Sequence, residues 1–172
     1  MALQFVPYCS YSDGEHDAVA GFIDVEQSKS AVIFDGHPLL ALPDDYISSL
    51  HINGGDLYVV YNRAILRVPD IDSGNNEPED HYTLEMQDYY SYEPPQLLSD
   101  LNGTLWAHIG GRLFRRDNQG DAWTQMAEFP IGEEAFVADG NTLKFSKNLL
   151  RDDDTQGYRC YKVDTGEIII EN

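Results

Sequence analysis

The sequence predicts an all-β fold built from three to four antiparallel sheets, forming a single domain over residues 1–172. Gly, Asn, Asp and Pro interrupt the apolar runs every few residues, so no window keeps the 3.6-residue periodicity of an amphipathic helix. The remaining runs are short and rich in Val, Ile, Tyr, Phe and Leu, which favour strands. A chain of 172 residues has the length of one ordinary domain.

Short apolar runs of this kind are the predicted strands. They lie next to turn-forming residues, as strands joined by tight hairpins do. They cover residues 30–34, 56–61, 64–68, 104–109, 112–116, 134–138 and 142–146.

A repeated pattern connects these strands. Segments 49–70, 98–117 and 134–153 each contain a strand, a turn with Asn-Gly or Asp-Gly, and a second strand with Leu near its start. These turn residues tolerate the positive φ of tight hairpins, and a spacing of about 40–50 residues between repeats is typical of the four-stranded blades of a β-propeller. A fainter copy covers 30–44, around Asp35-Gly36. We therefore expect a small β-propeller-like array, with a two-sheet β-sandwich as the alternative.

Residues 116–123, RDNQGDAW, resemble a worn Asp-box of the propeller-forming Asp-box and kelch families. Asn118, Gly120 and Trp123 stand at the Asp, Gly and Trp positions of that motif, whereas Arg116 and Ala122 replace its Ser and Thr. In those families the box is a structural turn between outer strands of a blade. The resemblance therefore implies a fold and not a catalytic site.

The balance of charge limits the classes of partner. Thirty Asp and Glu against eleven Lys and Arg give a formal net charge of −19 and a pI near 4.3, which disfavours binding to nucleic acid or to an anionic membrane. A basic protein partner is the better expectation. The chain shows neither a transmembrane-length apolar run nor a signal peptide, and only Cys9 and Cys160 are present, so we expect a cytoplasmic protein with reduced thiols.

No catalytic motif is found, so we expect no enzyme, no cofactor and no metal ligand. The five histidines form no metal-binding pair, and no nucleophile elbow or phosphate-binding loop is present. The segment DIDSGNNEPED (70–80) begins like an EF-hand loop, but Gly74 arrives one residue early and His81 stands where a bidentate Glu is required. A looser cation site, at Asp70 and Asp72 or at residues 152–154, stays open as an alternative.

The strongest functional feature is an acidic, tyrosine-rich tract within a stretch, residues 68–111, that contains no Lys or Arg. Carboxylates interleaved with flat rings would suit a basic groove that normally takes phosphates and stacked bases. The alternative is that the tyrosines pack in a sheet core and the acids keep a sheet edge soluble. The predicted partner-binding residues are Asp70, Asp72, Glu77, Glu79, Asp80, Glu85, Asp88, Tyr89, Tyr90, Tyr92 and Glu93.

These features favour an inhibitor that binds a basic enzyme and occludes its active site. The class features resemble those of immunity proteins that neutralise the toxins of contact-dependent inhibition or type VI systems, and the resemblance implies a cognate toxin, with a nuclease as one candidate, as the partner. A carbohydrate- or calcium-dependent recognition module is the alternative, with Trp106 and Trp123 as aromatic platforms.

Overall fold

The computed structural model describes residues 5–24, 26, 29–42, 46–61, 64–73, 80–83, 95–109, 111–116, 122–128, 133–147 and 158–171. The chain divides into two compact units, unit 1 over residues 1–85 and unit 2 over residues 86–172. The single domain expected over residues 1–172 stays a prediction.

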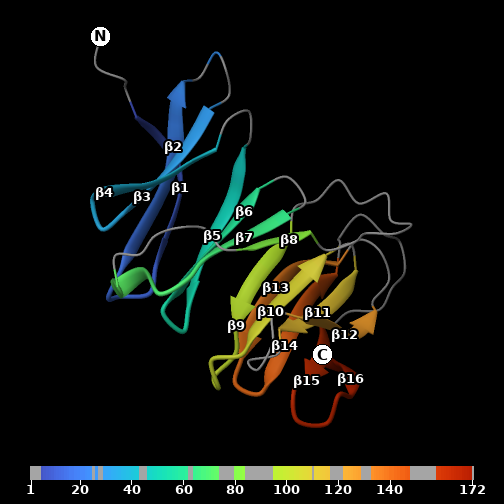
Figure 1. The fold of residues 1–172 in the computed structure, drawn as a ribbon. Helices are drawn as coiled ribbons and strands as arrows, with labels where there is room; N and C mark the ends of the chain where they lie inside the picture. Colours follow the sequence, from blue (N-terminus) through green and yellow to red (C-terminus); the bar gives the residue numbers. More distant parts are fainter. Residues whose placement is uncertain are drawn as a thin grey trace. The chain divides into compact units, whose positions relative to one another are not determined.

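Unit 1 contains two four-stranded antiparallel sheets, each a simple meander in the orders β1-β2-β3-β4 and β5-β6-β7-β8 (Figure 1). A short 3-10 helix, η1 (Ile71–Ser73), follows β7. The strands are β1 (Val6–Ser12), β2 (Asp17–Asp24), β3 (Lys29–Phe34), β4 (His37–Leu42), β5 (Ile47–Asn53), β6 (Asp56–Tyr61), β7 (Ala64–Val68) and β8 (Asp80–Thr83).

Unit 2 repeats this architecture with the sheets β9-β10-β11-β12 and β13-β14-β15-β16. Every neighbouring pair is antiparallel. The strands are β9 (Gln96–Ser99), β10 (Leu105–Ile109), β11 (Arg112–Arg116), β12 (Trp123–Glu128), β13 (Glu133–Asp139), β14 (Thr142–Lys147), β15 (Tyr158–Lys162) and β16 (Ile168–Glu171).

The all-β prediction is confirmed, and each predicted run forms a strand or lies within one, apart from Thr104, which precedes β10. The predicted Asn-Gly and Asp-Gly turns join the first and second strands of three sheets, and Gly54, Gly103 and Gly140 have the positive φ that those turns require. The fainter copy of the repeat, expected around Asp35-Gly36, has a different position within its sheet from the other three turns. Asp35-Gly36 joins the third and fourth strands of the first sheet, whose first hairpin is formed by residues 13–16.

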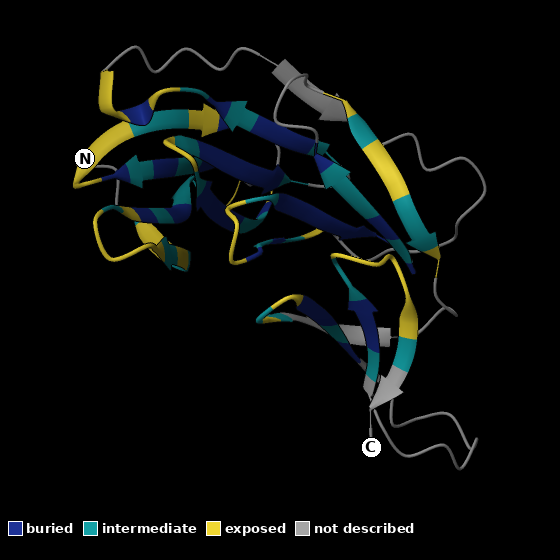
Figure 2. Ribbon diagram, turned by 90° about the horizontal axis from the view of Figure 1, so that it is seen from below, coloured by how far each residue is buried: buried dark blue, intermediate teal, exposed yellow. Residues whose placement is uncertain are grey.

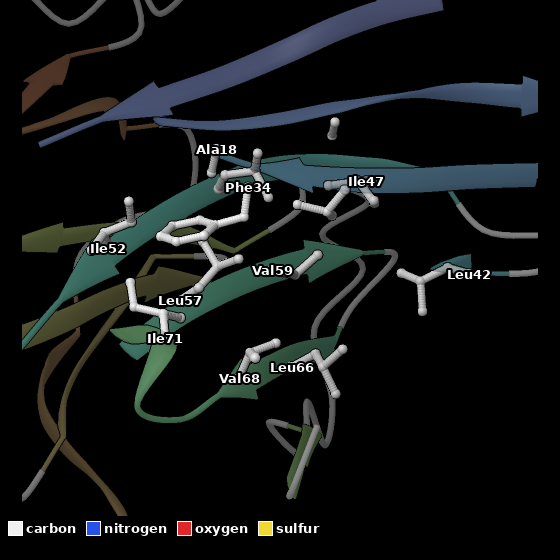
Figure 3. Packing of buried hydrophobic residues seen from close by; sticks show 13 residues of the cluster. Ala18, Phe34, Leu42, Ile47, Ile52, Leu57, Val59, Leu66, Val68 and Ile71 are labelled. Carbon is white, nitrogen blue, oxygen red and sulfur yellow. The ribbon is translucent and has the colours of Figure 1, made fainter. Parts of the chain in front are cut away.

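The core of unit 1 lies between its two sheets, where β1 and β2 face β5. Phe34, Leu57 and Ile71 project toward one another in this layer (Figure 3). Ile71 is only 5% exposed, so it anchors η1 to the sheets. Each fully buried aliphatic side chain of this kind contributes on the order of 2 kcal/mol.

The core of unit 2 forms around Trp106, Leu113, Leu143, Phe145 and Tyr161. The rings of Trp106 and Tyr161 meet edge to face, with their centroids 5.7 Å apart. Buried residues concentrate in the strands, whereas exposed residues gather in the turns (Figure 2). The helical content of the described residues is the three-residue η1, which is far too short to cross a membrane.

Among the described residues, a backbone hydrogen bond between two turns recurs in three sheets. In each of these sheets an N–H that follows the third strand donates to a carbonyl of the residue that begins or directly precedes the second strand. The pairs are Asp35 N to Asp17 O (2.9 Å), Ile71 N to Gly55 O (2.9 Å) and Val163 N to Asn141 O (3.0 Å). The turn after the third strand is thereby held against the first hairpin, which in unit 1 brings together acidic residues from both turns.

Candidate functional site

The structure describes only part of the predicted acidic tract. Asp70 and Asp72 lie beside and within η1, and both are exposed. Asp80 is the first residue of β8, where its backbone pairs with Arg67 of β7. The other predicted contacts lie outside the described residues: Glu77, Glu79, Glu85, Asp88, Tyr89, Tyr90, Tyr92 and Glu93.

Asp70 and Asp72 belong to a larger group of carboxylates, which we call the acidic rim. Alternate connections of a meander lie at the same end of a sheet, so the β1–β2, β3–β4 and β5–β6 turns and η1 meet at one end of unit 1 (Figure 1). Every member except the half-buried Asp56 is exposed. The acidic rim consists of Asp13, Glu15, Asp17, Asp35, Asp56, Asp70 and Asp72.

Asp35 occupies the centre of the rim. Its backbone has a positive φ of 46°, which Asp tolerates better than most residues. Its Oδ1 accepts a hydrogen bond from the Asp17 N–H (2.8 Å), and its Oδ2 lies 2.9 Å from Nδ1 of His16. These two interactions lower the pKa of the Asp35 carboxyl, so the group stays ionised in mild acid.

His16 lies between two carboxylates of the rim. Its Nδ1 contacts Asp35, and its Nε2 lies 3.2 Å from Oδ1 of Asp72. The hydrogen bond to Asp35, with the negative charges of Asp72, Asp35 and Asp13, raises the pKa of His16. When it is protonated, the imidazole forms ion pairs with both carboxylates and connects this part of the rim.

Asp56 organises the other side of the rim. Arg67 donates from Nε to Oδ2 of Asp56 (2.6 Å), and the Asp70 N–H donates to Oδ1 (3.1 Å). Asp70 itself has a positive φ of 47°, and its carbonyl accepts from the Ser73 N–H (3.0 Å). Asp56 is thus largely neutralised within the fold, whereas Asp70 and Asp72 face solvent.

The rim can present several carboxylates to a cationic partner without reorganising its backbone. Its acids come from segments distant in sequence, and the sequence prediction missed Asp13, Glu15, Asp17 and Asp35, because only the topology brings them to η1. Within the described residues, no group of three His, Cys, Asp or Glu side chains is placed to hold a metal ion. Electrostatic recognition of a basic surface is the chemistry that the rim supports best.

Asp100 lies in the stretch without Lys or Arg (residues 68–111), but it is buried and does not belong to an exposed acidic surface. It is 7% exposed, its Oδ1 accepts from the N–H groups of Asn102 (2.8 Å) and Thr104 (3.0 Å), and its Oδ2 accepts from Nε1 of Trp106 (2.9 Å). Trp106 is 1% exposed, so the prediction that it forms an exposed aromatic platform is wrong. The indole packs in the core of unit 2, and its N–H donates to Asp100 in the turn that precedes β10.

A different aromatic group lies at the end of the first sheet opposite the rim. The rings of Tyr8 and Tyr46 stack with centroids 4.8 Å apart and planes at 20°, and Phe22 lies 4.6 Å from Tyr8. The Tyr8 hydroxyl donates to Oγ of Ser30 (2.9 Å) and accepts from the Ile47 N–H (3.2 Å). Tyr46 remains 52% exposed. These rings lie on three separate segments, so no local sequence pattern indicates that they meet.

No family model matches the chain, and no curated protein matches it either. Solved structures share its fold. Two structures of the extracellular domain of a B. thetaiotaomicron protein, described as a one component system and as a hybrid two component system, match with TM-scores of 0.66 and 0.67 at 14% and 16% identity. They cover 97% and 96% of this chain, and 24% and 23% of their own. A puromycin-hydrolyzing peptidase of Mycobacterium tuberculosis matches with a TM-score of 0.58 at 15% identity, over 99% of this chain and 29% of its own. The chain thus spans less than a third of each of these structures, and at such identities the likeness concerns the fold alone.

Proposed function

We propose that this chain is an immunity-type inhibitor that binds a basic toxin enzyme, with a nuclease as the expected target, and occludes its active site. The observation that carries the proposal is the acidic rim, where exposed carboxylates from three connections gather at one end of unit 1. The net charge of −19 adds a long-range field of the same sign.

The mechanism is electrostatic capture followed by exclusion of substrate. Carboxylates of the rim pair with the Lys and Arg side chains that the enzyme uses to bind its own anionic substrate. Opposite fields raise the association rate constant to about 10⁸ M⁻¹s⁻¹ or more at low salt. Protection of a cell requires nanomolar affinity, which corresponds to about −12 kcal/mol.

The four-stranded meanders support a propeller-like scaffold for this surface. Each sheet has the strand order of a propeller blade, and the same bond between turns recurs in three sheets within the described residues. Loops at one end of such sheets form a continuous surface on a rigid framework, which suits recognition of a folded partner.

The first test combines capture with a paired charge reversal. Tagged protein is used to recover partners from native lysate at low and high salt, and any basic enzyme recovered is assayed with and without this chain. The double variant Glu15→Lys/Asp17→Lys should lower the association rate at least tenfold and flatten its salt dependence. The control Asp164→Lys/Glu167→Lys makes the same charge change at exposed sites of unit 2 and should have a much smaller effect. Equal effects of the two variants, or no inhibition of the recovered enzyme, would contradict the proposal.

We further propose that the protein works in the cytoplasm, where an incoming toxin nuclease would meet its substrate. The B. thetaiotaomicron structures that share its fold are extracellular domains, so the compartment has to be measured directly. Cell fractionation should recover the chain with cytoplasmic markers. Recovery outside the cell would remove the toxin-neutralising role.

Carbohydrate recognition is the second candidate, and the exposed face of Tyr46 is the observation that favours it. Stacked aromatic rings can form platforms for sugar rings. A rise in melting temperature with an oligosaccharide, abolished in Tyr46→Ala, would support this function. Such a result would contradict the inhibitor proposal, unless the Glu15→Lys/Asp17→Lys variant also slowed association with a recovered basic enzyme.

A further inference from the structure

His16 connects two parts of unit 1 that are far apart in sequence. Its Nδ1 lies 2.9 Å from Oδ2 of Asp35, in the β3–β4 turn, and its Nε2 lies 3.2 Å from Oδ1 of Asp72, in η1. The side chain is 18% exposed and its ring lies 5.2 Å from that of Phe34, so the imidazole is held in place rather than free in solvent.

The backbone around the imidazole is fixed on each side. Oδ1 of Asp13 accepts from the N–H groups of Glu15 (2.9 Å) and His16 (2.8 Å), which closes the β1–β2 turn. Asp35 is tied to Asp17 through its backbone N–H and its Oδ1. The buried side chain of Ile71 anchors η1. The three charged groups facing His16 are therefore Asp13 from its own turn, Asp35 from the next turn and Asp72 from η1.

The neutral and the protonated imidazole differ in how they can interact with the two nearby carboxylates. A neutral imidazole carries one N–H, so one nitrogen would direct a lone pair at a carboxylate oxygen. An imidazolium carries N–H groups on both nitrogens, so Nδ1 donates to Asp35 while the positive ring forms the ion pair between Nε2 and Asp72. Both contacts are therefore satisfied together only when His16 is protonated.

We propose that His16 is a proton-dependent link between the β3–β4 turn and η1, and that loss of its proton releases the carboxylate of Asp72. The Asp72 contact breaks first because it is the longer of the two and because the Asp72 side chain is 68% exposed, against 41% for Asp35. The link itself is independent of any partner. Its consequence for binding rests on the proposed function, since Asp72 is part of the acidic rim.

An NMR titration of the free, ¹⁵N-labelled protein between pH 5 and pH 9 tests the link. The ring nitrogens of His16 should both be protonated below a midpoint above the ordinary histidine value of about 6.5. The amides of Asp35, Asp72 and Ser73 should shift with that same midpoint. In His16→Gln these amides should lose the shared inflection.

Asp72→Asn keeps the size of the side chain at an exposed position and provides a second variant in case His16→Gln is poorly folded. It should move the His16 midpoint to lower pH, whereas Glu15→Gln, which removes an exposed carboxylate from the same turn, should move it less. A His16 midpoint at or below 6.5, separate titration of Asp72, or equal shifts in both variants would overturn the link. Because no partner is present, such a result would leave the proposed function standing.

Discussion

Asp72 and Asp100 both lie in the stretch without Lys or Arg, and they differ in surroundings. Asp100 is 7% exposed and accepts three hydrogen bonds from its own hairpin, whereas the side chain of Asp72 is 68% exposed and contacts His16. The Asp100 carboxylate is enclosed by its hydrogen-bond donors, whereas the Asp72 carboxylate contacts His16 and remains largely exposed to solvent. Charge density along a sequence thus cannot distinguish a structural acid from an interfacial one, because the donors that surround the acid decide its role.

Asp100→Ala should have the largest effect on stability. The change leaves the buried indole N–H of Trp106 and two turn N–H groups without their acceptor, which should cost about 3 kcal/mol in the free energy of unfolding. Both tryptophans, Trp106 and Trp123, lie in unit 2, so urea denaturation followed by Trp fluorescence reports on that unit.

The matched control for Asp100→Ala is Asp139→Ala in the same unit. Asp139 is the last residue of β13, much as Asp100 directly follows β9, but its side chain is 65% exposed and forms an ion pair with the half-buried Lys144 at 2.6 Å. Exposed ion pairs stabilise proteins little, so this change should shift the denaturation midpoint far less. Comparable shifts would show that burial does not distinguish the two acids.

Mild acid should produce the next largest effect, through the buried histidines rather than His16. Desolvation lowers the pKa of His51 and of His108 to about 4, so the unfolded chain binds more protons between pH 6.5 and 4. Each should therefore remove about 2 kcal/mol of stability at pH 5 relative to neutral pH. His16 has the opposite sign, because its raised pKa adds stability below pH 6.5 that is lost as the pH rises through the folded value.

His108→Leu separates these contributions in unit 2. Packing against Phe145, with ring centroids 5.1 Å apart, is altered, so absolute stability changes as well, and the slope of stability against pH is the quantity to compare. That slope between pH 7 and pH 5 should fall in the variant. An unchanged slope, monitored by Trp fluorescence, would show that His108 is not the group that titrates.

Asp56→Asn should have an intermediate effect on unit 1. Asp56 is 15% exposed at its side chain and accepts from Arg67 and from the Asp70 N–H, so it combines features of the buried Asp100 and the exposed Asp72. Removal of its charge should cost about 1 kcal/mol. Because both tryptophans are in unit 2, amide hydrogen exchange in β6 and β7 is the suitable measurement. Loss of protection in unit 2 rather than in these strands would contradict the view that Asp56 stabilises unit 1.

The fold was accessible from the sequence because the turn residues and the apolar runs occur within short segments. Asn102-Gly103 between two apolar strands identifies a hairpin without any knowledge of the rest of the chain. The rim and the rings of Tyr8 and Tyr46 were missed, because each is assembled from turns or strand ends that only the sheet topology brings together. The first hairpin, residues 13–16, was also missed because β1 mixes polar and apolar residues and lacks clean alternation.

Asp17→Asn should have the smallest effect on stability and therefore gives the clearest test of the rim as a binding surface. The interactions found for Asp17 use its backbone N–H and carbonyl, which Asn keeps, so the free energy of unfolding should change by less than about 0.5 kcal/mol. The same change removes one negative charge from the rim. Association with a basic partner should slow and its salt dependence should weaken, measured by stopped-flow mixing at several ionic strengths. A variant that is less stable but associates at the unchanged rate would place Asp17 with Asp100, among the acids that serve the fold.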